Sequence, residues 1–571
     1  MIKNCIILVV SVIVIALPFV FRQEALETDW KPGDPELVIV TPHNEAIRFE
    51  MEMAFSRWHQ EKYGKPVNID WRAIGGTTEI MRYLKSEYVS AVRAAWKNKD
   101  KNWAIKMGSD ILDRKFKPDG GASDEVFKFF RTTDDPTVFT SRMDMFFGGG
   151  QYDHDKAARE GLTVKPWSNG MLPESLFTED GIDMLPRFVS GEVWRTDYLF
   201  GSAISTFGIC YNLDRIKELG LGEPREWDDL ADFRFFKQVG AADPTKSGSI
   251  TKAFEMIIHQ KCYQAVRSAG FDDAQIAAFE KQIRTAGGKA WDIPEGVPPG
   301  YQAALEEGWM SGILLVQKIG ANARYFTDSA TKVPIDVSVG DAAAGLAIDF
   351  YGRYQAETSK APDGTERMRY FTPQGGSSVS CDPMSLLRGA PNRDLAVRFM
   401  VFVLSEDGQR IWNYKPGTPG GPVKYALRRL PIRRSFYPSS DPGIQVRFEQ
   451  HALHTTDDLG ADAVNPYKLS EAFVYHSRWT GRHFSIHRQI IKAMCLDSGD
   501  ELKAAWKTIH TGKGDRAAAM SALQTMPEGL NWRSAIEIFG DMDKRTMMRE
   551  WGRHYRGQYD EAARIARRPA A

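Results

Sequence analysis

Two short runs of glycine and hydroxyl residues are the strongest candidates for binding chemistry in this sequence. Gly75-Gly76-Thr77 follows the alternating strand pattern of 67–71, and Ser247-Gly248-Ser249 follows the apolar run 239–242. A helical pattern comes after each run, so each run would form the start of a helix. The free N–H groups and the dipole of a helix start favour anions. Taken singly, each run also fits an ordinary turn and N-cap, and that alternative stays open.

No motif in the chain indicates catalysis. The nucleophile-elbow, phosphate-loop and catalytic-cysteine patterns are missing from the sequence, so we expect no catalytic residues. His483 and His487 have the i,i+4 spacing of two metal ligands on a helix, but the segment HFSIH lacks the glutamate of an HExxH protease. A structural role is therefore favoured for both histidines.

Composition excludes other classes of function. The chain has 571 residues, enough for several domains, and its 74 Lys and Arg balance its 74 Asp and Glu. No net field would therefore recruit nucleic acid. The 5 cysteines are far apart and show no metal-binding spacing, and a disulfide among the last four cannot be assigned. The basic tract 428–434 is interpreted as a solvated linker.

The elements that would position the candidate residues alternate between strands and helices. Strand patterns at 37–40, 67–71 and 143–147 each lead into a loop and, for the first two, into a helical pattern. This rhythm indicates a mainly parallel sheet with helices on both faces, in which ligands bind beyond the carboxyl ends of the strands. The loops at His43-Asn44, 75–77 and 148–150 would share that edge.

The N-terminus carries an export signal. Lys3 precedes an apolar run over 5–21, which is short for a membrane span of about 20 residues and long for a signal-peptide core of about 7–15 residues. We therefore expect residues 1–28 to be a signal peptide or a membrane anchor. The chain would then be periplasmic or otherwise extracytoplasmic, and an uncleaved segment would hold it in the inner membrane.

Several longer segments carry a family resemblance. The run GAPNRDLAVRFMVFVLSEDGQRIW over 389–412 has helical spacing, with Asn392 as a candidate N-cap and a turn at 405–408. This run resembles bacterial extracellular solute-binding proteins of ABC importers, as do MDMFFGGG, FGICYNLDRI, REWDDLADF, AADPTKSGS and VGDAAAGLAIDFYG, in that order along the chain. The most similar branch is that of the ferric-iron-binding proteins, and the resemblance covers roughly residues 36 to 424.

The resemblance implies an α/β, two-lobed periplasmic-binding-protein-like fold (type II) with mainly parallel sheets, an N-terminal hydrophobic segment and a helical C-terminal extension. Four parts of the chain are expected after residue 35. Lobe 1 is 36–205, with a helical insertion at about 89–140; lobe 2 is 206–374; 375–429 returns to lobe 1; and 430–571 is an extension of unknown role. For the extension we favour packing on one lobe over a separate interaction domain.

The ferric branch binds iron through two adjacent tyrosines, a histidine, a glutamate and an anion. Carried onto this sequence, His43 matches the histidine, and the tyrosine pair falls on Phe350-Tyr351, where phenylalanine has no oxygen to donate. The glutamate position falls near 148–149, where glycine supplies no ligand, although Asp349 could substitute. Fe(III), as a ligand rather than a cofactor, and an organic anion or phosphorylated small molecule therefore both stay open. Arg353 could pair with an anion if a strand continues through it.

Two functions are compatible with the sequence. The first is a binding protein that closes over a small molecule or metal and delivers it to ABC-importer permease subunits. The second is a membrane-anchored sensory or enzymatic ectodomain that reuses the fold. The expected ligand-binding residues are His43, Asn44, Gly75, Gly76, Thr77, Gly149, Ser205, Ser247, Gly248, Ser249, Asp349, Tyr351 and Arg353, with His43 and Tyr351 as the candidate metal ligands.

Overall fold

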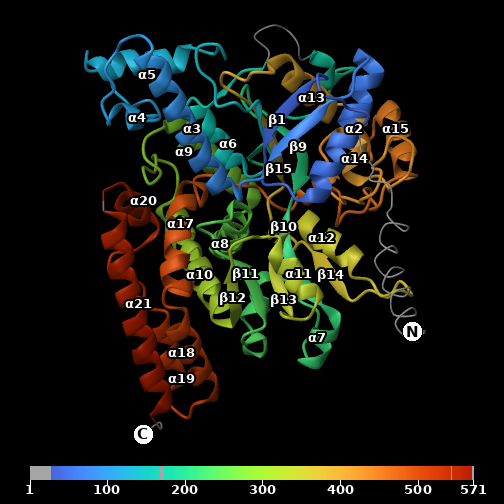
Figure 1. Ribbon diagram of the computed structural model, residues 1–571. Coiled ribbons are helices and arrows are strands. Elements are labelled where there is room, and N and C mark those ends of the chain that lie inside the picture. Colours follow the sequence, from blue (N-terminus) through green and yellow to red (C-terminus); the bar gives the residue numbers. More distant parts are fainter. Residues whose placement is uncertain (1–27, 167–172, 542, 569–571) are drawn as a thin grey trace, which may run out of the picture.

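The computed structural model describes residues 28–166, 173–541 and 543–568, and these residues form two lobes, each built around its own sheet (Figure 1). The apolar run 5–21 lies outside the described residues. Among the residues that are described, no helix is long and apolar enough to cross a membrane.

The first lobe contains a mixed sheet. From edge to edge its strands are β16 (Leu430–Pro431), β9 (Phe200–Ser205), β15 (Ser380–Leu387), β3 (Met145–Phe147), β1 (Glu36–Val40) and β2 (Asn68–Arg72), and β4 (Thr163–Val164) also pairs with β15. The strands β2, β1 and β3 are parallel, whereas β15 runs antiparallel to β3 and β9. Leu37, Ile39 and Val40 of β1 are completely buried, as expected for a strand covered on both faces.

Helices and small hairpins surround this sheet. The helices are α2 (Glu45–Tyr63), α3 (Thr77–Lys97), α4 (Met107–Asp110), α5 (Ala122–Thr132), α6 (Gln151–Arg159), α13 (Arg393–Leu404) and α14 (Glu406–Asn413). The hairpins are β5 (Thr178–Glu179) with β6 (Ile182–Asp183), and β7 (Phe188–Val189) with β8 (Glu192–Val193). Because α3 continues to Lys97, the insertion after it begins later than residue 89, where it was expected.

The second lobe repeats the plan on a smaller scale. Its strands are β12 (Ala323–Thr327), β11 (Val239–Ala242), β13 (Ala344–Ile348), β10 (Phe207–Asn212) and β14 (Met368–Phe371), and its helices are α7 (Leu213–Glu218), α8 (Gly248–Ser268), α9 (Asp273–Ala286), α10 (Pro299–Asn322), α11 (Lys332–Ser338) and α12 (Asp349–Thr358). A Cβ atom on Gly308 of α10 would lie 2.5 Å from the Cα atom of Cys262 on α8, which shows that these two helices pack very closely. Cys262 and the other described cysteines, Cys210, Cys381 and Cys495, are free and buried, so they act as small apolar side chains.

The chain crosses between the lobes through adjacent segments. It passes from β9 to β10 through Thr206, and it returns between β14 and β15, where Gly375 lies. In the first sheet the arriving strand is β15, which is antiparallel to the parallel strands β1, β2 and β3. In the second sheet it is β10, which is antiparallel to the parallel strands β11, β12 and β13. The fold is therefore the two-lobed type II α/β fold that the resemblance implied, but its sheets are mixed because of these crossing strands.

The C-terminal extension is divided between the lobes, which corrects the expectation that it packs on one of them. Residues 430–472 belong to the first lobe: Leu430 of β16 pairs with Ile204, and Arg433 donates to the carbonyl of Leu176 at 2.9 Å. This part contains α15 (Pro442–Ala452) and α16 (Pro466–Leu469). Near Ser470 the chain crosses once more, since the next helices pack on the second lobe.

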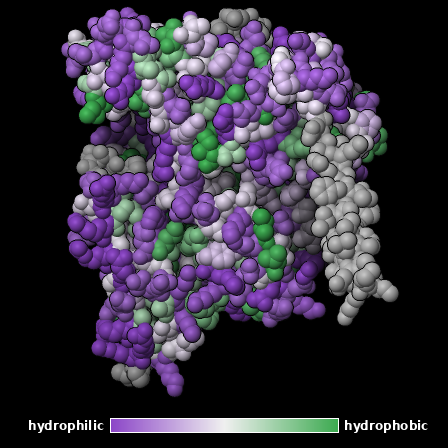
Figure 2. Space-filling model, in the orientation of Figure 1, coloured by the Kyte–Doolittle hydropathy of each residue, from purple (hydrophilic) through white to green (hydrophobic). Residues whose placement is uncertain are grey.

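The second part of the extension completes the core of lobe 2. Its helices are α17 (Phe484–Ile491), α18 (Gly499–Thr511), α19 (Arg516–Leu523), α20 (Trp532–Asp541) and α21 (Lys544–Arg567). The side chains of α10 bond directly to them: Trp309 Nε1 donates to His487 Nε2 at 2.9 Å, and Gln317 donates to Tyr559 Oη at 3.0 Å. His487 is therefore structural. The outer face of this region is mainly hydrophilic in Figure 2, because Tyr555 and Tyr559 of α21 are turned inward.

Candidate functional site

The two lobes face each other across a cleft with a cavity of about 2210 Å³. This volume exceeds the ~300–1,000 Å³ of an ordinary small-molecule pocket. The size of the cavity therefore does not select a ligand, and the polar groups that line it must provide the selection. Of the expected residues, the cleft is lined by His43, Asn44, Gly75, Gly76, Thr77, Gly149, Ser205, Ser247, Gly248, Ser249 and Tyr351, but not by Asp349 or Arg353.

Helix starts from opposite lobes meet inside this cleft. A Cβ atom on Gly76, the N-cap of α3, would lie 2.7 Å from the carbonyl oxygen of Lys246, which precedes α8. A Cβ atom on Gly248, the first residue of α8, would lie 2.9 Å from Thr77 Oγ1. Only glycine allows this approach. The positive ends of both helix dipoles therefore point into the same small space.

A third helix start belongs to the same space. α6 begins after Gly150, and Gly149 has a φ of 107°, a backbone conformation that L side chains rarely adopt. A Cβ atom on Gly149 would also lie 2.2 Å from Thr77 Cγ2, so the loop needs glycine for space as well. The starts of α3, α6 and α8 together concentrate partial positive charge.

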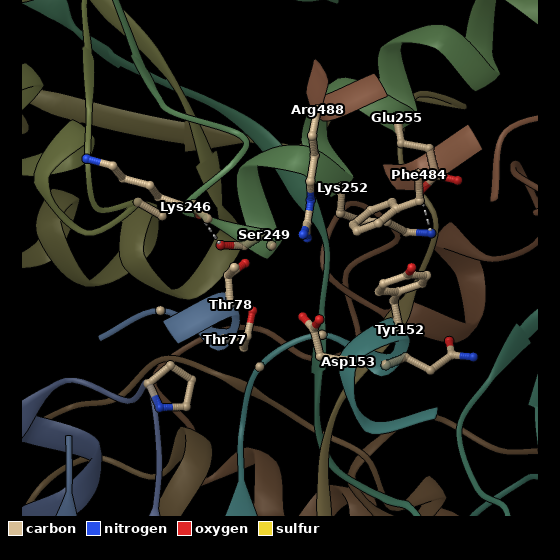
Figure 3. Close-up of a pocket in the computed structure, with 18 of the residues that line it drawn as sticks. Thr77, Thr78, Tyr152, Asp153, Lys246, Ser249, Lys252, Glu255, Phe484 and Arg488 are labelled. Atoms are coloured by element: carbon tan, nitrogen blue, oxygen red, sulfur yellow. Dashed lines mark hydrogen bonds and ion pairs between the residues drawn. The ribbon is translucent and has the colours of Figure 1, made fainter. Parts of the chain in front are cut away.

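Two hydroxyl groups at the start of α3 have no partner within the described protein. Thr77 is 4% exposed, and its Oγ1 atom, like that of Thr78, is buried without a hydrogen bond. By contrast, Ser247 Oγ accepts from the N–H of Ile250 at 3.3 Å and caps α8. Buried hydroxyl groups normally find partners, so those of Thr77 and Thr78 are available to a ligand (Figure 3).

A buried ion-pair cluster borders this part of the cleft. Lys252 Nζ of α8 lies 3.0 Å from Glu192 Oε1 of lobe 1 and 3.2 Å from Glu255 Oε2 (the Lys252–Glu255 pair is visible in Figure 3), and it lies 3.7 Å from the ring centre of Tyr475. Burial alone would lower the pKa of Lys252, but the two carboxylates outweigh it and raise that pKa. Lys252 is thus a charged side chain that already has partners, and it connects the two lobes.

His43 has acidic and basic partners of its own. Its Nε2 atom lies 2.6 Å from Asp382 Oδ2, and Asp382 Oδ1 also accepts from the N–H of Gly149 at 2.6 Å. The guanidinium of Arg429 bonds to the same Asp382 carboxylate and donates to Ser205 Oγ at 2.9 Å. A cationic side chain therefore neutralises the carboxylate beside His43.

The charge states of this cluster depend on its burial. Burial would raise the pKa of Asp382, but Arg429 and His43 outweigh it and hold that pKa well below its usual range. Burial lowers the pKa of His43 despite the nearby carboxylate. His43 is then neutral, and its hydrogen bond to ionised Asp382 requires the proton on Nε2. To bind a metal through Nε2, His43 would have to lose its hydrogen bond to Asp382.

The segment at Tyr351 differs from the expected strand. The strand ends at Ile348 and the helix α12 begins at Asp349, so residues two apart no longer share a face. Arg353 is directed to Asp457 of the extension, 4.0 Å away, rather than to the cleft. Tyr351 lines the cleft, and burial raises the pKa of its phenol.

Asp349 is buried at the start of α12. Its Oδ1 atom accepts from the N–H of Phe350 at 2.9 Å, while its Oδ2 atom has no partner among the described residues. Burial raises the pKa of Asp349 to about 6, although Arg353 and Arg429 act against this. Unlike the other expected residues, neither Asp349 nor Arg353 lines the cleft. Among the described residues, no three His, Cys, Asp or Glu side chains cluster closely enough to hold a metal ion.

Sequence reasoning missed two residues that line the cleft, Asp382 and Arg488, and a fully buried residue bonded to one of them, Arg429. Arg429 lies in the basic tract that was interpreted as a solvated linker, yet it is completely buried and stacks 3.9 Å from the ring centre of Phe350. Charge runs usually face solvent, and no local signal distinguishes this arginine from its neighbour Arg428. Arg488 comes directly after His487 on α17, where only the tertiary fold places it in the cleft.

Comparison with known families agrees with this architecture. Residues 165–437 match the family described as bacterial extracellular solute-binding protein. The resemblance found in the sequence is thereby confirmed over that segment. The family that matches this segment is one of binding proteins.

Individual relatives share only part of the sequence. The iron uptake protein A2 of Synechocystis sp. is 31% identical over 131 residues, which are 21% of this chain and 36% of that protein, so the match spans about a third of the relative's length. A periplasmic binding protein, AfuA of Actinobacillus pleuropneumoniae, solved with fructose-6-phosphate, is 15% identical with a TM-score of 0.42, covering 79% of this chain and 98% of its own. The ferric binding protein of Campylobacter jejuni is 15% identical with a TM-score of 0.40, covering 80% and 99%.

Proposed function

We propose that this protein is the extracytoplasmic substrate-binding subunit of an ABC importer and that it captures a small anionic solute between its lobes. The observation that carries the proposal is the buried, unpartnered hydroxyl of Thr77 at the point where the starts of α3 and α8 meet. An anion there would accept from the hydroxyl and from free backbone N–H groups, and it would neutralise the helix dipoles.

Ligand capture by such a site depends on lobe closure. Gly76 lies close to Lys246 and Thr77 lies close to Gly248 across the cleft, so a ligand bound beside these residues touches both lobes at once. A ligand that binds the closed form better than the open form shifts the population toward closure. The closed form is the one we expect permease subunits to recognise.

Ligand screening is the direct test of this function. The chain from Glu36 onward, purified without its N-terminal segment, is heated in the presence of phosphate monoesters, organic carboxylates, ferric complexes and polyamines. A true ligand at 100 times its Kd should add about 2.7 kcal/mol to the apparent stability. We expect anions to shift Tm and polyamines not to shift it. If no anion in the panel has an effect, the proposed ligand class is wrong.

Fe(III) is a second candidate ligand, supported by the name of the iron uptake relative and by the position of Tyr351 in the cleft. If Fe(III) binds through a tyrosinate, the complex should show a visible charge-transfer band that disappears in Tyr351→Phe. Tyr354 also lines the cleft, so Tyr354→Phe is the matched control and should keep the band. A colourless complex would remove Tyr351 as a metal ligand.

Delivery to a permease and attachment to the membrane belong to the same proposal. Residues 1–28 would direct export, and an uncleaved segment would hold the protein at the inner membrane. Stimulation of the importer's ATPase by the liganded protein would support transport. A sensory or enzymatic ectodomain, the alternative from the sequence, would give no such stimulation.

A further inference from the structure

We propose that Arg488, in the C-terminal extension and outside the matched family segment, binds the anionic group of the ligand. This inference rests on the proposed capture of an anion and assigns to the extension a direct part in recognition. The extension would then be part of the binding site rather than a separate module.

Arg488 is fixed in place on the lobe 2 side of the cleft. It lies on α17, which packs against α8, and its Nε atom donates to Thr251 Oγ1 of α8 at 3.1 Å. Its guanidinium also stacks 4.8 Å from the ring centre of Phe484. The guanidinium is thus anchored through Nε, which lowers the entropic cost of binding a ligand through Nη2.

The free edge of Arg488, at Nη2, has no partner in the described part of the protein. Its Nη2 atom is buried without a hydrogen bond and forms no ion pair with a carboxylate of the described residues. Arg488 is half-buried, and a half-buried guanidinium without a carboxylate carries a desolvation cost that an anion can offset. This is the reverse of Arg429 and Lys252, which both have acidic partners.

The free edge of Arg488 faces the hydroxyl groups of α3. A Cβ atom on Gly248 would lie 3.7 Å from Arg488 Nη2, 2.9 Å from Thr77 Oγ1 and 3.4 Å from Asp153 Oδ2, so these three groups surround one point. Figure 3 shows Arg488 and Asp153 pointing toward each other from opposite sides, with Thr77 and Thr78 beside them. An anion bound beside Gly248 would meet donors from both lobes.

Asp153 restricts the class of ligand. Its carboxylate would repel a bare anion, but it would accept a hydrogen bond from a hydroxyl or amino group next to the anionic group. The arrangement therefore favours an anion that carries such a donor, for example a phosphate monoester of a polyol.

The extension also closes the entrance beside this point. Tyr152 Oη of α6 lies 2.9 Å from Ser485 Oγ, and the rings of Tyr152 and Phe484 are 4.9 Å apart. These contacts join lobe 1 to α17 three and four residues before Arg488. Lobe closure thus brings Arg488 opposite Thr77 and shields both from water, which strengthens their interaction with an anion.

The test compares two arginines of the extension that both line the cleft. Calorimetry measures the binding of glycerol 3-phosphate to the wild type, Arg488→Gln, Arg488→Lys and the exposed control Arg482→Gln. Loss of a charge-assisted bond should weaken binding about 10- to 100-fold in Arg488→Gln, whereas Arg482→Gln should stay within about twofold of the wild type. Arg488→Lys should recover part of the affinity, because it keeps the charge but not the forked geometry.

The outcomes separate the two proposals. Wild-type affinity in Arg488→Gln would overturn the role of Arg488 and leave anion capture intact. Equal weakening of binding in Arg488→Gln and Arg482→Gln would show that the loss comes from the change in net charge alone. That result would also overturn the role of Arg488. If the wild type binds neither glycerol 3-phosphate nor any other anion of the screening panel, anion capture itself fails and this inference fails with it. The Tm of each unliganded variant shows whether it has folded.

Discussion

The two ends of the cleft differ in how their charged side chains are paired. At one end, His43, Asp382, Arg429 and Ser205 bond to one another, although His43 Nδ1 and Arg429 Nε have no hydrogen-bond partner among the described residues. At the other end, Thr77, Thr78 and Arg488 present buried polar atoms without partners in the described protein. The first end has its own cation, Arg429, beside its carboxylate, whereas the polar groups of the second end need a ligand as their partner. This difference teaches that cleft-lining position alone does not identify a binding residue.

The self-paired end coincides with the positions at which the family resemblance places iron ligands. There the Arg429 guanidinium stacks on Phe350, the residue that replaces one tyrosine, and bonds to the Asp382 carboxylate beside His43. A buried carboxylate can be balanced by a metal ion or by an arginine. In this chain an arginine fills that role, so we expect the solute to bind at the other end.

The largest expected effect tests whether the first end is structural. In Asp382→Asn, Arg429 loses its buried carboxylate, and the free energy of unfolding should fall by about 3–5 kcal/mol in denaturant titrations at pH 7. Because the pKa of Asp382 is lowered in the fold, its contribution is present above the ordinary carboxyl pKa of about 4 and is lost as the pH falls further.

The matched control for this loss is Asp197→Asn. Asp197 bonds to Lys165 at 2.8 Å, but both side chains are well exposed, so this variant should lose far less stability. Equal losses in the two variants would contradict a special role for the buried network.

A smaller effect tests the unpaired carboxylate beside that network. Burial raises the pKa of Asp349 to about 6, so the fold favours its protonated form, and the ionised form weakens stability as the pH rises through that value. Relative to the wild type, Asp349→Asn should therefore gain roughly 2–3 kcal/mol between pH 4 and pH 7, measured by denaturant titration at each pH. A difference that does not change with pH would show that the Asp349 carboxylate is not strained by burial.

The smallest effect tests whether the second end works only when the lobes are closed. Gly76 has an ordinary φ of −71°, so alanine fits its backbone, but the added Cβ atom would lie 2.7 Å from the carbonyl oxygen of Lys246 on the other lobe. Gly76→Ala should hold the lobes apart and weaken anion binding roughly tenfold, or about 1–2 kcal/mol. Calorimetry measures the affinity, and small-angle scattering measures the opening.

Gly222→Ala is the control for this substitution, because a Cβ atom there would meet nothing within 4 Å. It should leave both affinity and shape unchanged. Wild-type affinity in Gly76→Ala would mean that close contact between α3 and α8 is not needed for capture.

Local patterns predicted many of the elements. The strand expected at 37–40 is β1, and Ser247 caps α8 as its position before the helical run suggested. The helix expected to follow Asn392 and to end at the turn over 405–408 is α13, which ends at Leu404; the second helix, α14, which Ser405 caps, was not expected. The strand expected to continue through Arg353 is a helix, since the apolar run of β13 ends at Ile348 and carries no signal for the helix that begins at Asp349.

The amino-acid sequence by itself determined the fold class and the two glycine–hydroxyl helix starts, because apolar periodicity, caps and glycines act over a few neighbouring residues. Only the tertiary structure decided which polar groups have partners. Arg429 and Arg488 look alike in the sequence, yet Arg429 meets Asp382, 47 positions away, while the free edge of Arg488 meets no carboxylate of the described residues. Pairing between residues so far apart depends on how the lobes pack, and that pairing separates the structural end of the cleft from the end that we propose binds the ligand.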